Sequence, residues 1–258
     1  MTRIIGVVSG KGGVGKTTMV ANLGMALAKM GRNVVILDAN LTTPSLGLHL
    51  GLPLYPVTLH DVLKGRANIK DAIYMHESGV KIIPAGISLR DMRGVDSKDL
   101  PNALLDLLGS AEIVLLDASA GFGRETLAAI EAADEIVIVT NPEISAVTDA
   151  LKASKIAEQL GTKVTGLILN RVTGKNYEMS TRDIMGMLDN VTLIGEVPED
   201  SEVQKAVALR MPVVRNNPKS AASNKIMRIA ASLVGEEDNF REVTPWYRKM
   251  FSFSRKYN

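Results

Sequence analysis

The chain has 258 residues, of which 46% are apolar and 22% charged, so it is long enough to close one sizeable hydrophobic core. It contains no cysteine, which excludes a disulfide framework, a thiolate nucleophile and a cysteine-held zinc or iron–sulfur site. Its net charge of +2 is too small to indicate nucleic-acid binding, and no apolar run approaches the roughly 18 residues that span a bilayer, so we expect a soluble, cytoplasmic protein.

From the amino terminus onward, short runs of apolar, β-branched residues alternate with segments of helical periodicity. Strands are predicted at residues 3–8, 33–38, 81–84, 112–117, 135–140, 163–170 and 191–197. Helices are predicted at residues 16–30, 100–108, 124–133, 144–159, 177–188, 201–210 and 221–233. The strand runs are continuously apolar, as in parallel strands covered on both faces. The pattern predicts an α/β fold, namely a doubly wound, mostly parallel sheet with helices on both faces.

A glycine-rich segment follows the first predicted strand. Residues 10–17, Gly-Lys-Gly-Gly-Val-Gly-Lys-Thr, fit the phosphate-binding pattern G-x-x-x-x-G-K-[ST] and open the first predicted helix. The backbone amides of such a loop and the helix N-terminus bind phosphate oxygens. We expect Lys16 to reach the β and γ phosphates of ATP and the Thr17 hydroxyl to bind Mg²⁺. The other ATP-binding residues predicted in this segment are Gly12, Gly13, Val14, Gly15 and Thr18.

A second lysine, Lys11, stands near the start of this loop. With it, the segment resembles the deviant Walker A motif of the MinD/ParA family of P-loop ATPases. The resemblance implies an ATP-sandwiched homodimer in which Lys11 crosses to the phosphates of the partner's ATP and stabilises the charge of phosphoryl transfer. The alternative, which the spacing alone does not exclude, is a solvated loop lysine.

Further segments that match this family follow the predicted strands. Residues 38–40, Asp-Ala-Asn, correspond to its D-x-D switch, and residues 117–121 to its D-x-P-A-G segment. The resemblance implies that Asp38 and Asp117 act at the metal and that Asp38 and Asn40 act in catalysis with the two lysines. It implies ATP binding by Gly121, Glu143, Asn170, Arg171, Pro198, Asp200 and Val203. These residues lie at or just beyond the carboxyl ends of predicted strands, where an open α/β sheet binds its ligand.

Two residues depart from the family pattern. Asn40 stands where the family has an aspartate that orients or deprotonates the attacking water. Because an amide does not accept a proton as a carboxylate does, we expect a chain that binds ATP and dimerises but hydrolyses ATP slowly. The alternative is natural variation in which another group places the water. Ser119 replaces a proline, which loosens that turn but leaves Asp117 and Gly121 available.

The last fifteen residues, 244–258, form a separate tail after an ATPase domain of residues 1–243. The tail holds four basic residues and no acidic one, whereas the domain holds 26 basic and 28 acidic residues. As a helix, the tail gathers large apolar side chains on one face, a pattern typical of a helix that lies in a membrane surface. These side chains are Trp246, Met250, Phe251, Phe253 and Tyr257. The tail resembles the membrane-targeting helix of MinD proteins; packing on its own domain, binding of a partner protein and disorder are the alternatives.

The resemblance favours a MinD-like ATPase switch that forms an ATP·Mg²⁺-dependent homodimer. Such a switch associates reversibly with the anionic inner face of the cell membrane and positions the division site or an unidentified regulatory or cargo protein. A ParA-like DNA-partition ATPase is the first alternative, which the nearly neutral domain and the aromatic tail disfavour. A metal-cluster carrier of the same fold conflicts with the lack of cysteine. A regulatory ATPase that docks proteins, in flagellar, pilus or chemosensory positioning, is the third alternative.

Overall fold

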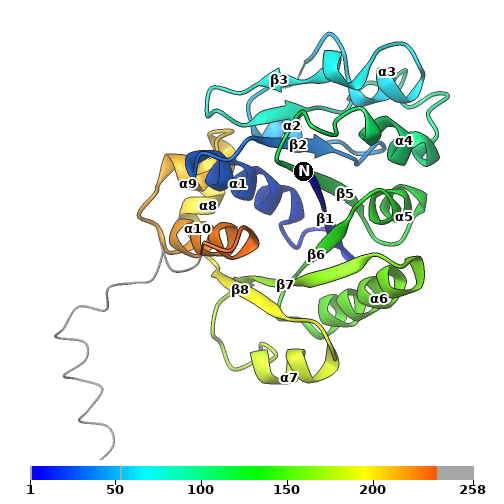
Figure 1. Cartoon of the computed structure of the whole chain (residues 1–258). Helices are drawn as coiled ribbons and strands as arrows, with labels where there is room; N and C mark the ends of the chain where they lie inside the picture. Colours follow the sequence, from blue (N-terminus) through cyan, green and yellow to red (C-terminus); the bar gives the residue numbers. More distant parts are fainter. Residues whose placement is uncertain (1, 53, 237–258) are drawn as a thin grey trace, which may run out of the picture.

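An eight-stranded sheet organises the chain (Figure 1). The computed structural model describes residues 2–52 and 54–236. The strands are β1 (Arg3–Ser9), β2 (Val34–Asp38), β3 (Tyr74–Met75), β4 (Lys81–Ile83), β5 (Ile113–Ala120), β6 (Glu135–Thr140), β7 (Lys163–Val172) and β8 (Leu193–Pro198). Their order is β3-β4-β2-β5-β1-β6-β7-β8, and within the described chain every neighbouring pair is parallel except β3 with β4. The predicted doubly wound, mostly parallel sheet is therefore confirmed.

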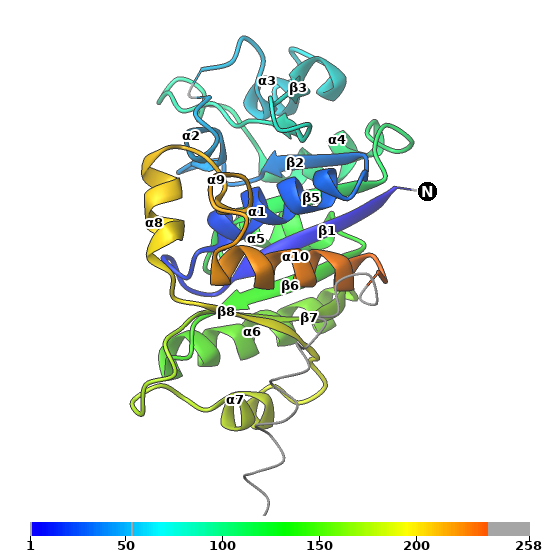
Figure 2. The ribbon, with the colours of Figure 1, turned by 90° about the vertical axis from the view of Figure 1, so that its left-hand side faces the viewer.

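Helices cover both faces of this sheet (Figures 1 and 2). Side chains of α3 (Leu59–Leu63), α4 (Leu100–Leu105), α5 (Arg124–Glu131), α6 (Ile144–Leu160) and α7 (Thr181–Met187) belong to the hydrophobic core on one face. The core on the other face includes α1 (Lys16–Lys29), α2 (Leu46–His49), α8 (Ser201–Ala208), α9 (Val213–Asn216) and α10 (Ala221–Leu233).

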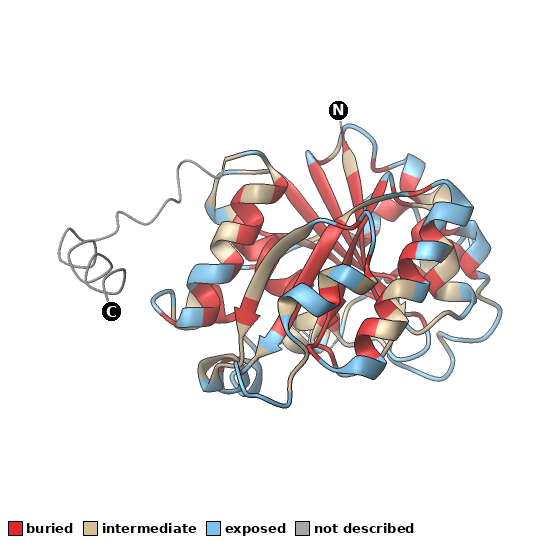
Figure 3. Cartoon of the chain, turned by 90° about the horizontal axis from the view of Figure 1, so that it is seen from below, coloured by how far each residue is buried: buried red, intermediate tan, exposed pale blue. Residues whose placement is uncertain are grey.

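The central strands supply residues to both cores in alternation. In β1, Ile4 and Val8 pack in the core with α5 and α6, whereas Ile5 and Val7 pack in the core with α1 and α10. All residues of β2 and β6 are buried. In the burial map the strands in the middle of the molecule are mostly red, whereas the surrounding helices carry pale blue on their outer sides (Figure 3). Burial on both faces explains why these strands read as continuous apolar runs rather than as alternating ones.

The observed elements differ from the predicted ones mainly in short pieces. The prediction missed β3, the four- and five-residue helices α2, α3 and α9, and two 3₁₀ turns at Ile69–Ala72 and Ser97–Asp99. Helix α7 begins at Thr181 rather than at residue 177, because the Ser180 hydroxyl accepts a hydrogen bond from the Asp183 amide and caps the helix there. Among the described residues, no helix combines the length and apolarity needed to cross a bilayer. The predicted tail and its membrane residues lie outside the described residues.

Candidate functional site

The phosphate-binding loop joins β1 to α1 and depends on left-handed glycines. Gly13 and Gly15 have φ angles of +83° and +91°, a conformation that residues with a Cβ disfavour. Val14 is buried in the core and anchors the loop, whereas Gly12 and Gly13 are exposed. Lys16 is the first residue of α1, so Thr17 and Thr18 lie in its first turn, where backbone amides lack partners inside the helix. The loop thus offers free amide donors next to a lysine.

Lys16 of α1, two aspartates of neighbouring strands and a serine hydroxyl lie beside this loop. Lys16 Nζ lies 2.5 Å from Asp117 Oδ1 in the carboxyl-terminal half of β5, and both side chains are buried. Asp38, at the end of β2, stands opposite Asp117 in the parallel register of the two strands. Asp117 Oδ2 and the Ser9 hydroxyl at the end of β1 are buried without a hydrogen-bond partner. Unpaired buried oxygens next to a lysine indicate that this cluster is completed by a ligand.

Asp38 is held by backbone amides of the loop that follows β2. Its carboxylate accepts hydrogen bonds from the amides of Leu46 at 2.9 Å, Ser45 at 3.0 Å and Asn40 at 3.2 Å. Burial, followed by the proximity of Asp117, raises the pKa of Asp38 to about 7. Because ionisation of this buried carboxyl is costly, a nearby cation would stabilise its charged form.

The same loop faces the start of α1. The Ser45 hydroxyl lies 3.3 Å from the Thr17 hydroxyl and so ties the loop to the predicted metal ligand. Asn40 is partly exposed, and its side-chain amide donates to the Thr43 carbonyl at 2.7 Å. Its Oδ1 accepts from the Thr43 amide at 3.0 Å and lies 3.0 Å from the Ser119 hydroxyl. The two residues that depart from the family pattern, Asn40 and Ser119, are therefore in direct contact.

A cavity of about 370 Å³ opens beside the loop and brings together most of the residues predicted to bind ATP beyond it. The predicted residues that line it are Gly13, Gly15, Thr18, Asn170, Arg171, Pro198, Asp200 and Val203. The sequence analysis missed its apolar wall, which Met19, Val207 and Ile226 form from three helices with Val203. An apolar cavity next to a phosphate-binding loop has the character of a site for a flat base ring.

Several predicted ATP-binding residues also have structural roles. Asn170 Nδ2 donates to the Val14 carbonyl at 2.7 Å and braces the loop. Asp200 caps α8 by accepting from the Glu202 amide at 2.9 Å, and it also accepts from the Ala222 amide at 3.1 Å. Burial raises the pKa of Asp200, but these two amide contacts outweigh burial and hold the pKa below its ordinary value. Gly121 has a φ of +85° and donates its amide to the Ser9 carbonyl at 3.0 Å, next to the phosphate-binding loop.

Lys11 and Glu143 pair with each other within the chain. Lys11 Nζ lies 3.0 Å from Glu143 Oε2 and 3.1 Å from the Ser145 hydroxyl. Both charged side chains are about half exposed, and neither lines the apolar cavity. The predicted crossing of Lys11 to a partner subunit and the contact of Glu143 with ATP remain predictions.

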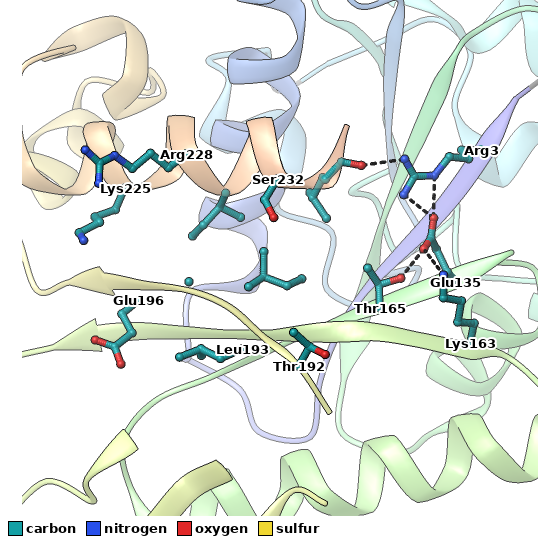
Figure 4. A pocket seen from close by; sticks show the side chains of 14 residues that line it. Arg3, Glu135, Lys163, Thr165, Thr192, Leu193, Glu196, Lys225, Arg228 and Ser232 are labelled. Carbon is teal, nitrogen blue, oxygen red and sulfur yellow. Dashed lines mark hydrogen bonds and ion pairs between the residues drawn. The ribbon is translucent and has the colours of Figure 1, made fainter. Parts of the chain in front are cut away.

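A second cavity, of about 600 Å³, lies at the other end of the sheet between α10 and β8 (Figure 4). Arg3, Glu135 and Lys163, at the amino ends of β1, β6 and β7, line it and form an ion-pair cluster around Glu135. It is larger than the cavity at the phosphate-binding loop, but its position at the amino ends of the strands separates it from the site predicted by the motif.

Comparison with known proteins relates this chain to one family, to sequence relatives and to solved structures. The model of the family described as ParA: NUBPL iron-transfer P-loop NTPase matches residues 1–234. An uncharacterised ATP-binding protein of Methanocaldococcus jannaschii is 47% identical over 235 residues, which cover 91% of this chain and 89% of that protein. The structure of the septum site-determining protein MinD from Pyrococcus horikoshii, complexed with Mg-ADP, is 34% identical, with a TM-score of 0.88 and coverage of 94% and 100%. A MinC:MinD cell division protein complex from Aquifex aeolicus is 30% identical, with a TM-score of 0.80 and coverage of 91% and 96%.

Proposed function

Because this chain belongs to the ParA family of P-loop NTPases and is similar to MinD ATPases, we propose that it is a MinD-like switch driven by ATP. The switch binds ATP with Mg²⁺, forms a homodimer around two ATP molecules and attaches reversibly to the inner face of the cell membrane. Hydrolysis to ADP and phosphate then releases it. Its output is the position of a partner protein or of the division site.

One observation carries the nucleotide part of this proposal. The phosphate-binding loop, Lys16 and an apolar cavity of about 370 Å³ adjoin one another at the carboxyl ends of the strands. A triphosphate on the loop amides and Lys16 leaves its base within reach of Val203 and Ile226. We expect a fluorescent ATP analogue to bind with Mg²⁺ present, and Lys16→Ala to weaken that binding by at least about tenfold, since it removes a charge-assisted contact.

The residues present also fit a magnesium ion. Hard oxygen donors suit Mg²⁺, and Thr17, Asp38 and Asp117 bring such donors together next to the phosphate-binding loop. Within the described residues, no group of three or more His, Cys, Asp or Glu side chains forms a metal site by itself. Thr17 would hold the ion through its hydroxyl, and the carboxylates of Asp38 and Asp117 would hold its bound water. When bound, Mg²⁺ neutralises charge on the β and γ phosphates.

The membrane part of the proposal rests on the sequence of the tail. Burial of four of the tail's side chains in a membrane surface, Trp246, Met250, Phe253 and Tyr257, gains roughly 6–12 kcal/mol. Ordering about fifteen residues at roughly 1 kcal/mol or more each offsets much or all of that gain. The four cations add up to about 1 kcal/mol each on anionic lipid. One tail therefore binds weakly, whereas two tails on a dimer gain avidity of roughly 10²–10⁴. ATP-dependent dimerisation thus controls attachment.

Sedimentation with anionic liposomes tests this proposal. The full chain is compared with a Trp246→Glu/Phe253→Glu variant, each with ATP·Mg²⁺ or ADP·Mg²⁺. A Tyr177→Glu variant serves as the matched control, because Tyr177 is an exposed aromatic residue outside the tail. We expect pelleting only with ATP and an intact tail. If the full chain stays in the supernatant with ATP, the membrane part fails, and DNA binding that falls steeply with added salt becomes the test of the ParA-like alternative.

A further inference from the structure

A hydrogen-bonded chain of side chains links α5 to the loop after β2. The carboxylate of Glu125, in the first turn of α5, accepts from the Leu41 amide at 3.0 Å and from the Thr42 hydroxyl. It also accepts from the Ser119 hydroxyl, which lies 3.0 Å from Asn40 Oδ1. Glu125 therefore reaches, through one hydroxyl, the residue that the family pattern places at the attacking water.

The hydrogen-bonded network has one proton fewer than the hydrogen-bond contacts that Ser119 makes in it. Ser119 has a single hydroxyl proton and stands within hydrogen-bond distance of two acceptors, Asn40 Oδ1 and Glu125. When its proton points to Glu125, the gap between Ser119 and Asn40 holds none. A proton that arrives at this gap can be taken up by Ser119 while the original hydroxyl proton passes to the carboxylate of Glu125.

The network lies at the phosphate end of the site. Asn40 is two residues beyond Asp38, and Ser119 is two residues beyond Asp117, the partner of Lys16. The Asp38 carboxylate accepts hydrogen bonds from backbone amides and Asp117 Oδ1 pairs with Lys16, and both side chains are buried. Glu125 is instead partly exposed, so it can release a proton to solvent.

We propose that Glu125 supplies, through Ser119, the proton-accepting carboxylate that Asn40 lacks; this inference rests on the ATPase function proposed above. In the reaction, the water oxygen bonds to the γ phosphorus and the bond from that phosphorus to the β–γ bridging oxygen breaks, which yields phosphate and ADP. The water proton passes to Ser119 as the Ser119 proton passes to Glu125, which later releases it to solvent. Glu125 acts through Ser119 and is thus a positioning residue. Asn40 and Ser119, the two departures from the family pattern, thus belong to one proton-transfer network.

Steady-state ATP hydrolysis with Mg²⁺ tests this inference on the full chain and on Glu125→Gln, Glu125→Asp, Asn40→Asp and Glu125→Gln/Asn40→Asp. Glu131→Gln is the matched control, because Glu131 is an exposed acid on the same helix. Glutamine keeps an acceptor oxygen for the Leu41 amide, presents an NH₂ group instead of an oxygen to the Thr42 hydroxyl, and removes the basic group. We expect Glu125→Gln to lower kcat by at least about tenfold with KM and the affinity for a fluorescent ATP analogue within about twofold. Glu125→Asp recovers part of kcat, and adding Asn40→Asp restores the level of the unmodified chain.

Each outcome decides between the alternatives. If Glu125→Gln retains kcat, or if Asn40→Asp fails to restore it, Glu125 is a structural residue and the inference is wrong. If the unmodified chain is inactive but Asn40→Asp hydrolyses ATP, Glu125 does not supply the base. If neither hydrolyses ATP although both bind the analogue, the proposed ATPase function itself fails. Thermal melting identifies a variant that does not fold, in which case Glu125→Asp and Ser119→Ala carry the test, with Ser119→Ala expected to lower kcat as Glu125→Gln does.

Discussion

Replacing Asp38 with asparagine tests the electrostatics of the phosphate end of the site. In the folded chain, burial raises the pKa of Asp38 to about 7, whereas the ordinary value is 3.8. The unfolded chain therefore releases this proton at lower pH than the folded chain does. Stability from this group is fully present below pH 3.8 and is lost as the pH rises toward 7.

The size of the effect follows from the two pKa values. At about 1.4 kcal/mol per pKa unit, the loss between pH 5 and pH 8 is about 2.5 kcal/mol of unfolding free energy. Asp38→Asn does not titrate and lacks this slope. Its amide group faces the Ser45 and Leu46 amides, which costs about 1–3 kcal/mol at every pH relative to a chain with Asp38 protonated. The stability advantage of the unmodified chain therefore shrinks by about 2.5 kcal/mol over this range.

Urea unfolding followed by circular dichroism at pH 5, 6.5 and 8 measures this difference, with EDTA present and no nucleotide. Asp189→Asn is the control, because Asp189 is an exposed acid away from the site. The unfolding free energy of this control should change with pH by the same amount as that of the unmodified chain. If the curves of Asp38→Asn and the unmodified chain are also parallel, the argument from the buried carboxylate is refuted.

Three further predictions concern the loop, the base cavity and the dimer. Gly15→Ala should lower the melting temperature by about 5 °C. The added Cβ would lie 2.4 Å from Asn170 Nδ2, and a φ of +91° costs a residue with a Cβ about 1–2 kcal/mol, so an unchanged melting temperature would contradict this prediction. Val203→Asp should weaken binding of a fluorescent ATP analogue by at least about tenfold, because it puts a carboxylate in the apolar wall, and equal affinity in the titration would count against the base site. Lys11→Ala should leave that affinity within about twofold, since its exposed pair with Glu143 contributes little, but should abolish ATP-dependent dimers in light scattering; persistent dimers would show that Lys11 does not cross.

The long elements of the fold were predictable because each is long enough for its sequence pattern to repeat. The buried strands β2 and β6 appear in the sequence as apolar runs. Helices α6 and α10 show helical periodicity, which ends at a glycine after α6 and at a turn after α10. Strand β3 has two residues and α2 and α9 have four each, about one period of the strand or helix pattern, so the pattern does not repeat within them. Their positions depend on tertiary packing.

The site divides in the same way. The phosphate-binding loop and the strand-end carboxylates are local in sequence, so the motif predicted them. Met19, Val207 and Ile226 each read as an ordinary core residue of its own helix, and three helices must meet before they form one wall. Glu125 carries no motif, and its contact with the loop after β2 spans 84 positions of sequence to Leu41. Departures from the family pattern at Asn40 and Ser119 were the available signal for that network.

The exposed pair of Lys11 with Glu143 has a kinetic consequence. Surface ion pairs of this kind are worth about 0–1 kcal/mol, and exposed side chains change rotamer within picoseconds to nanoseconds. Lys11 therefore leaves Glu143 and returns many times before two copies of the chain collide. In the proposed homodimer, breaking this resting contact would therefore add little to the activation barrier of association.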